Sequence, residues 1–201
     1  MTGCYTRREL TKLGLAGVGD AVYVHRTVLF FGARRIHLGS HVRIDAYAVI
    51  SAGDGRARVR IGNYVHVSTG VSILGSGGVD IADFCSISVR VAVFSSSDDF
   101  RSGAMGSPMV PRHMRQITIQ PVSIEKHVII GAGTVILPGV RLGTGAAIGA
   151  LSVVRQHVPP FTVAAGNPLR LLGKRGRLML KVEKELRARP SRTNHTSSRS
   201  T

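Results

Sequence analysis

The stretch VIIGAGTVILPGVRLGTGAAIGALSVV, residues 128–154, repeats with a period of six. Ile130, Ile136, Leu142, Ile148 and Val154 stand six residues apart, and a glycine directly follows three of them. A period of six matches no face of an α-helix. It fits a short strand, with alternate side chains pointing inward, followed by a tight turn. Three such strands form one triangular coil, so the stretch predicts a parallel β-helix built from hexapeptide repeats.

The same period extends toward the N-terminus and defines six triplets of apolar residues. Their members are Val18, Val24, Phe30; Leu38, Ile44, Ile50; Ile61, Val67, Ile73; Ile81, Ile87, Val93; Ile124, Ile130, Ile136; and Leu142, Ile148, Val154. The residues two positions before these are mostly valine, and none is aromatic or charged. Because one coil cannot bury its own apolar face, the triplets predict a stack of about six coils stabilised by contacts between neighbours.

Insertions between the triplets always follow the third strand, so they all leave the prism at one corner. The longest, residues 94–121, reads FSSSDDFRSGAMGSPMVPRHMRQITIQP and contains many Ser, Gly and Pro residues. A long irregular loop inside a compact domain is usually functional or disordered. Its single exit corner favours a protruding functional loop.

The periodicity also divides the chain into segments. Residues 1–17 are expected to form an N-terminal cap with a short helix, and residues 18–158 the β-helix with its loop. Residues 159–189 would form a C-terminal segment ending in a helix, because Leu178, Val182 and Leu186 have helical spacing. The Ser-, Arg- and Thr-rich residues 190–201 are expected to be disordered.

The composition indicates a folded protein with a large positive charge. The 201 residues are 43% hydrophobic and 19% charged, which provides enough apolar material for a core. The net charge is +16, a balance that favours anionic ligands such as nucleic acid, a membrane surface or phosphate-bearing small molecules. Two distant cysteines, Cys4 and Cys85, form no metal-binding or disulfide framework. The sequence contains no signal peptide and no membrane span, so we expect a cytoplasmic protein.

Several motifs together resemble the hexapeptide-repeat acyltransferases. They are the block at 128–154, AAGNPLRLLGKR at 164–175, SSDDF at 96–100, RID at 43–45 and YVH at 64–66. The resemblance covers about residues 10–185 and is nearest to the galactoside and maltose O-acetyltransferases. The SSDD, RID and YVH motifs resemble a branch found in polysaccharide and O-antigen gene sets.

The resemblance implies an all-β fold, a left-handed parallel β-helix that assembles as a homotrimer. Acetyl-CoA would lie in a groove between subunits, and the acceptor, a sugar hydroxyl or amine that may be nucleotide-linked, would enter from the other end. The implied reaction is direct acetyl transfer without a covalent enzyme intermediate and without a metal. It requires a base close to the acceptor and backbone N–H groups that stabilise the oxyanion.

The family's catalytic histidine position falls on Asp98 in this chain, and no histidine occurs in residues 94–100. Either a carboxylate acts as the base, or a histidine elsewhere does. His66 and His127 are the histidine candidates. The alternatives are that Asp98 and Asp99 open a loop as a turn, that His66 is an interface or surface residue, and that His127 caps a turn.

The resemblance also implies a set of acetyl-CoA-binding residues. The backbone of Gly131 and Ala132 would meet the pantetheine amides, and Ala150 and Arg155 belong to the next coil. The turn Gly166-Asn167-Pro168 leads to Arg170 and Lys174, whose charges would hold the phosphates of CoA. The family commonly has Thr-Lys where this chain has Arg155 and Gln156, which keeps a positive charge one position earlier.

The sequence favours an acetyl-CoA-dependent sugar O- or N-acetyltransferase. The main alternative is a β-helix that binds without catalysis. A γ-class carbonic anhydrase requires more than the HxxxH pair His37 and His41. Nucleic-acid binding would rest on charge alone, because no aromatic stacking platform is evident.

Overall fold

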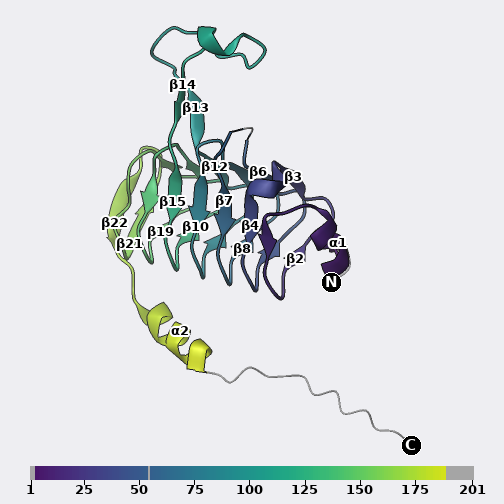
Figure 1. The fold of residues 1–201 in the computed structure, drawn as a ribbon. Coiled ribbons are helices and arrows are strands. Elements are labelled where there is room, and N and C mark those ends of the chain that lie inside the picture. Colours follow the sequence, from purple (N-terminus) through teal and green to yellow (C-terminus); the bar gives the residue numbers. More distant parts are fainter. Residues whose placement is uncertain (1–2, 54, 189–201) are drawn as a thin grey trace, which may run out of the picture.

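The computed structural model describes residues 3–53 and 55–188 and contains a parallel β-helix with three sheets (Figure 1). Sheet 1 comprises β1 (Gly17–Val18), β4 (Ile36–Leu38), β7 (Val59–Ile61), β10 (Val79–Ile81), β15 (Val122–Ile124) and β18 (Arg141–Leu142). Sheet 2 comprises β2 (Tyr23–Val24), β5 (Arg43–Ile44), β8 (His66–Val67), β11 (Ser86–Ile87), β16 (Ile129–Ile130), β19 (Ala147–Ile148), β21 (Thr162–Ala165) and β22 (Arg170–Lys174). Sheet 3 comprises β3 (Leu29–Phe31), β6 (Val49–Ser51), β9 (Ser72–Leu74), β12 (Ala92–Phe94), β17 (Val135–Ile136) and β20 (Val153–Val154).

The chain visits the sheets in the order 1, 2, 3, so three edges separate them. We call these edge 1–2, edge 2–3 and edge 3–1. Every edge is crossed once per coil, and residues at equivalent positions of successive coils stack about 4.8 Å apart. The register between strands pairs each predicted inward residue with its counterpart, for example Ile81 with Ile61 and Ile124.

The predicted core is confirmed. All eighteen repeat positions are buried except Val18 and Phe30, which are partly buried and pack against the core. Two inward residues are polar, Thr134 and Ser152, and their hydroxyls donate to the carbonyl of Gly149 at 3.0 and 2.7 Å. These bonds remove the cost of burying the two hydroxyl groups.

The stack is longer than the periodicity indicates. Six complete coils are followed by part of a seventh, because Val158 pairs with Leu142 and β21 adds to sheet 2. The last strand, β22, pairs antiparallel with β21. The predicted end of the β-helix at residue 158 is therefore early: Pro159 and Pro160 interrupt the six-residue pattern, but the backbone resumes its place in the sheet immediately afterward.

The insertion at 94–121 leaves at edge 3–1, as the spacing predicts, but it is not wholly irregular. Its two ends form an antiparallel ribbon of β13 (Ser96–Asp98) and β14 (Ile117–Ile119). The ribbon projects from the β-helix and carries a loop with the short 3-10 helix η2 (Arg112–Met114) (Figure 1). We call residues 95–120 the arm.

Both helices predicted from the sequence are present. Helix α1 (Arg7–Lys12) has a capping box between Thr6 and Glu9, and its Leu10 is buried against the first coil. Helix α2 (Leu178–Ala188) lies on the side of the β-helix away from the arm (Figure 1). The tail at 190–201, expected to be disordered, lies outside the described residues. Within the described ranges, no helix has the length and apolar character that crossing a membrane requires.

Candidate active site

Asp98 is the last residue of β13 and lies at the end of the ribbon where the loop of the arm begins. Its backbone pairs with Ile117, and its side chain is 43% exposed. Asp99 has a different role, because its carboxylate accepts hydrogen bonds from the backbone N–H groups of Arg101 and Ser102. Asp99 therefore stabilises the turn that opens the loop, while the Asp98 carboxylate remains accessible to a ligand.

Arg115 faces Asp98 across the ribbon, with 3.6 Å between Nη2 and the carboxylate oxygen Oδ1. The Arg115 side chain is only 14% exposed, and its Nε atom is buried without a hydrogen-bond partner among the described residues. The sequence analysis did not single out Arg115, because no motif links it to Asp98 and only the ribbon pairing brings them together.

His66 lies on the outward face of sheet 2, in β8. Its Nε2 atom is 2.7 Å from Oδ2 of Asp45, and the other oxygen of that carboxylate, Oδ1, accepts a hydrogen bond from Nε of Arg43 at 2.6 Å. Partial burial acts to raise the pKa of Asp45, but the hydrogen bonds from His66 and Arg43 outweigh burial and lower it. The motif residues Arg43, Asp45 and His66 thus form one hydrogen-bonded group on neighbouring coils.

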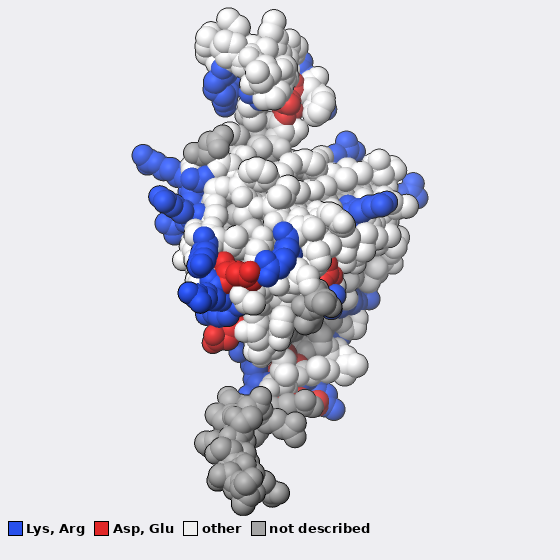
Figure 2. Space-filling model, turned by 90° about the vertical axis from the view of Figure 1, so that its right-hand side faces the viewer, with Lys and Arg blue, Asp and Glu red and all other residues white. Residues whose placement is uncertain are grey.

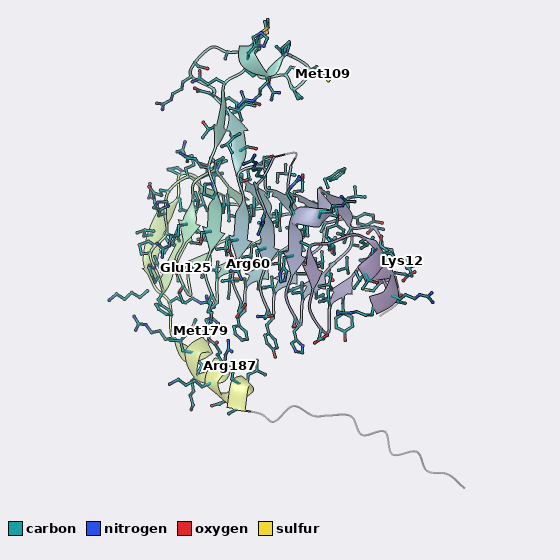
Figure 3. The ribbon with its side chains drawn as sticks, viewed as in Figure 1. Lys12, Arg60, Met109, Glu125, Met179 and Arg187 are labelled. Carbon is teal, nitrogen blue, oxygen red and sulfur yellow. The ribbon has the colours of Figure 1, made fainter. Side chains whose placement is uncertain are left out.

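His127 occupies edge 1–2 and is nearly inaccessible, with 6% of its side chain exposed. Its ring stacks on Phe84 at 5.1 Å between centroids, continuing a stack through Tyr64 and His41. Its Nε2 atom lies 2.6 Å from a carboxylate oxygen of Glu183 in α2. These contacts attach α2 to the β-helix. Figure 3 shows Arg187 and Met179 on this helix, on the side away from Met109 in the arm.

The three catalytic candidates do not come together within one chain. Asp98 leaves from edge 3–1, His127 sits at edge 1–2, and His66 lies on the sheet opposite edge 3–1. A site that used Asp98 together with His66 would need a second subunit.

Most of the candidate CoA-binding residues line one edge. Gly131, Ala132, Ala150 and the turn from Gly166 to Pro168 occupy edge 2–3 in three successive coils. A Cβ atom on Gly131 would lie 2.4 Å from the backbone nitrogen of Ala150, so the close stacking of these coils requires glycine there. The N–H of Leu151 donates to the carbonyl of Ala132 at 2.8 Å, which keeps the two turns in register.

The remaining candidates flank the same end of the β-helix. Arg155 follows β20 and lines a small hollow of about 80 Å³ together with Val153, Gln156, Pro168 and Leu169. Arg170 and Lys174 lie at the two ends of the exposed strand β22. Among the described residues, neither side chain forms an ion pair with an acid. Their charges are available to an anionic ligand.

The geometry of the described residues does not favour a cysteine nucleophile or a metal site. Burial raises the pKa of the Cys85 thiol to about 12, so this cysteine is protonated at neutral pH and is a poor nucleophile. In the part of the chain that the structure describes, no group of three or more His, Cys, Asp or Glu side chains is arranged to hold a metal ion.

Comparison with known proteins identifies the family. Residues 121–156 match the family model described as "Bacterial transferase hexapeptide (six repeats)". The chain is 40% identical over 175 residues to the dTDP-4-amino-4,6-dideoxy-D-glucose acyltransferase of Escherichia coli, covering 87% of this chain and 90% of that protein. It is 32% identical over 138 residues to the putative lipopolysaccharide biosynthesis O-acetyl transferase WbbJ of Escherichia coli K12, covering 68% and 67% of the two chains.

A solved structure with a similar fold is that of AntD, an N-acyltransferase from Bacillus cereus, in complex with dTDP and 3-hydroxybutyryl-CoA. The TM-score is 0.87 and the identity 32%, over 92% of this chain and 97% of AntD. The chain belongs to the hexapeptide-repeat transferases. Its fold and its relatives make it an acyltransferase, as the sequence motifs predict.

Proposed function

We propose that the protein transfers an acyl group from acyl-CoA to the 4-amino group of a dTDP-linked 4-amino-4,6-dideoxyhexose. The observation that carries this proposal is the 40% identity, over nearly the full length of both chains, to an acyltransferase named for that sugar. AntD, which has been solved with dTDP and an acyl-CoA, supports the same pair of substrate classes. We propose that the enzyme acts in the cytoplasm.

The residue at the catalytic position supports an amine rather than a hydroxyl acceptor. A sugar hydroxyl must lose its proton as it attacks, which favours a base as strong as histidine. An uncharged amine attacks with its own lone pair and needs a base only to remove a proton from the nitrogen afterward. A carboxylate such as Asp98, which is paired with Arg115, is sufficient for that second task.

In the proposed reaction, the acceptor nitrogen attacks the thioester carbonyl and forms a tetrahedral intermediate with a negatively charged oxygen. Asp98 takes one proton from the nitrogen. The intermediate then collapses, the carbon–sulfur bond breaks, and the CoA thiolate leaves and receives a proton. We propose that the donor lies along Gly131, Ala132, Ala150 and the turn Gly166-Asn167-Pro168, with Arg155, Arg170 and Lys174 contacting its phosphates.

A second residue is suggested by the solved relative. AntD was crystallised with replacements of an aspartate and of a serine ten positions before it. In this chain Ser88 stands ten positions before Asp98, at edge 2–3 in line with the proposed donor site. Within one chain, Ser88 and Asp98 lie on either side of the extended strand β12, which advances about 3.3 Å per residue, so the two side chains are far apart. We propose that the two act on one acceptor from neighbouring subunits.

This arrangement requires an oligomer, and we propose a homotrimer. Sheet 3 presents the half-exposed apolar residues Leu29 and Phe31, and the arm exposes Phe100 and Met109 almost completely. Large apolar side chains in such positions are typical of surfaces covered by another chain. Light scattering at micromolar concentration should give three times the mass of one chain, and a monomer would contradict the proposal.

The substrate is tested with a panel of acceptors. The full chain is incubated with acetyl-CoA and, separately, with dTDP-4-amino-4,6-dideoxyglucose, the matching dTDP-6-deoxyhexose with a 4-hydroxyl group, and the free amino sugar. Product mass and released thiol are measured, and 3-hydroxybutyryl-CoA replaces acetyl-CoA in a second series. We expect product from the dTDP-linked amine. Acylation of the hydroxyl compound alone would overturn the amine assignment.

A further inference from the structure

A groove lined by basic side chains lies on the outward side of sheet 1, toward the N-terminal end. It encloses about 810 Å³, and its lining includes Arg34, Arg35, His37, Arg56, Arg58 and Arg60. Among the described residues, none that lines the groove is acidic. Figure 2, which views the molecule from its N-terminal side, shows Lys and Arg side chains gathered along one flank, and Figure 3 shows Arg60 on the outward face of sheet 1.

The β-helix itself brings these residues together. Arg56, Arg58 and Arg60 alternate with Ala57 and the buried Val59, so the three arginines point to the same outward side as the chain enters β7. The residues Arg34 and Arg35, in the 3-10 helix η1 (Ala33–Arg35), stand on the coil before. The register pairs His37 with Arg60 across the two coils.

Most of this charge is not compensated within the described residues. Arg60 forms a bidentate pair with Asp80, with contacts of 2.7 and 3.0 Å, and Arg35 donates a hydrogen bond to the backbone carbonyl of Gly53. The Nε atom of Arg35 is buried and has no partner among the described residues. Like charges that line one groove repel one another, most strongly over distances up to the screening length of about 8 Å at physiological salt. A bound anion would relieve that repulsion.

The size and chemistry of the groove indicate a small ligand with more than one phosphate. Its volume lies within the range of small-molecule sites, about 300–1,000 Å³. Guanidinium groups bind phosphate oxygens in pairs, and several arginines together match a diphosphate. The lining contains no aromatic side chain on which the bases of a nucleic acid could stack.

The groove also lies near edge 3–1, from which the arm that carries the proposed catalytic residue projects. The carbonyl of Arg58 accepts a hydrogen bond from Val79, and the carbonyl of Gly78 accepts one from Val122, where the arm returns to the β-helix. Arg58 is therefore two coils, or about 10 Å, from the base of the arm. The groove lies on the N-terminal side of the point where the arm leaves the β-helix, and the proposed CoA-binding residues lie on its C-terminal side.

We infer that the arginine groove binds the diphosphate of the nucleotide-linked acceptor, with Arg56 and Arg58 as the main contacts. This inference rests on the proposed function, which it deepens by assigning the acceptor's charged part to residues of this chain. The donor and the acceptor would then approach Asp98 from opposite ends of the β-helix, and the phosphates of each would have their own arginines.

The test uses the full chain with dTDP and, separately, inorganic pyrophosphate as calorimetric probes. The double variant Arg56→Gln/Arg58→Gln is compared with Arg8→Gln, which removes an exposed arginine of α1 outside the groove. Arg56 and Arg58 are exposed, so melting curves should show that the double variant remains folded. We expect the Kd for both probes to rise at least tenfold in the double variant and to stay within twofold in Arg8→Gln.

Kinetic measurements separate the possible sources of phosphate. With acetyl-CoA and the dTDP-linked amine, we expect the acceptor KM of the double variant to rise at least tenfold while the acetyl-CoA KM stays within twofold. Unchanged Kd values for the probes would overturn the inference. An equal rise in the acetyl-CoA KM would also overturn it, because the groove would then serve the donor.

The binding experiment also distinguishes failure of this inference from failure of the proposed function. Arginine-dependent binding of dTDP, without acylation of any dTDP-linked amine, would support the groove and contradict the proposed reaction. Acylation of the dTDP-linked amine with unchanged kinetics in the double variant would support the proposed reaction and contradict the assignment of the groove.

Discussion

The replacement Asp98→Asn tests the proposed base directly. Asparagine has nearly the same size and can still accept a hydrogen bond, but it cannot take a proton at neutral pH. General bases typically contribute about 100-fold to the rate or more. We therefore expect turnover to fall at least 100-fold, equivalent to about 2.7 kcal/mol in the activation barrier.

The structure separates this loss from any effect on folding. The Asp98 side chain is 43% exposed, and the oxygen of an asparagine in its place could still accept a hydrogen bond from Arg115, which is 3.6 Å away. The backbone pairing with Ile117 is unaffected by the substitution. The thermal midpoint should therefore change by a few degrees at most.

The assay is steady-state release of CoA thiol with saturating acetyl-CoA and a range of dTDP-linked amine concentrations. A second variant, Arg115→Met, keeps the length of the side chain and removes its charge. Because Arg115 acts through Asp98, we expect Arg115→Met to lower turnover by a smaller factor than Asp98→Asn does, and to leave the acetyl-CoA KM unchanged. A decrease of less than threefold in Asp98→Asn would refute the carboxylate base.

Three other predictions follow from the site. In His127→Asn, turnover should stay within threefold while α2 becomes more sensitive to limited proteolysis, because the contact with Glu183 and the stack on Phe84 are lost; a 100-fold loss of turnover would instead restore His127 as a catalytic candidate. Burial acts to raise the pKa of Glu183, but its hydrogen bonds with His127 and Arg187 outweigh burial and lower it. Ionised Glu183 therefore stabilises the docked helix above its unfolded pKa, about 4.3, and protease sensitivity of α2 should increase as pH falls through the lower folded value. The substitution Arg170→Ala should raise the acetyl-CoA KM several-fold with little effect on turnover, because it removes ground-state binding, and an unchanged KM would exclude Arg170 from the donor site.

Much of the β-helix can be predicted from the sequence because a solenoid repeats one short structural unit. A period of six with apolar residues at two fixed positions specifies which side chains point inward, and each coil contacts only its neighbours. The buried columns and the exit edge of the arm were therefore predictable. The end of the stack was not predictable, because Pro159 and Pro160 interrupt the six-residue pattern just before β21, which still pairs with β19.

For the site, the sequence by itself determined which residues have family motifs around them, and the resemblance aligned Asp98 with the family's catalytic histidine. Only the tertiary structure decided what each of them contacts. Glu183 is 56 residues from His127, and only the docking of α2 brings it into contact with that buried ring. Arg115 reaches Asp98 through the pairing of two strands that the repeat does not encode. The arginine groove is likewise invisible in any single motif, since its charges come from two coils and converge only when those coils stack.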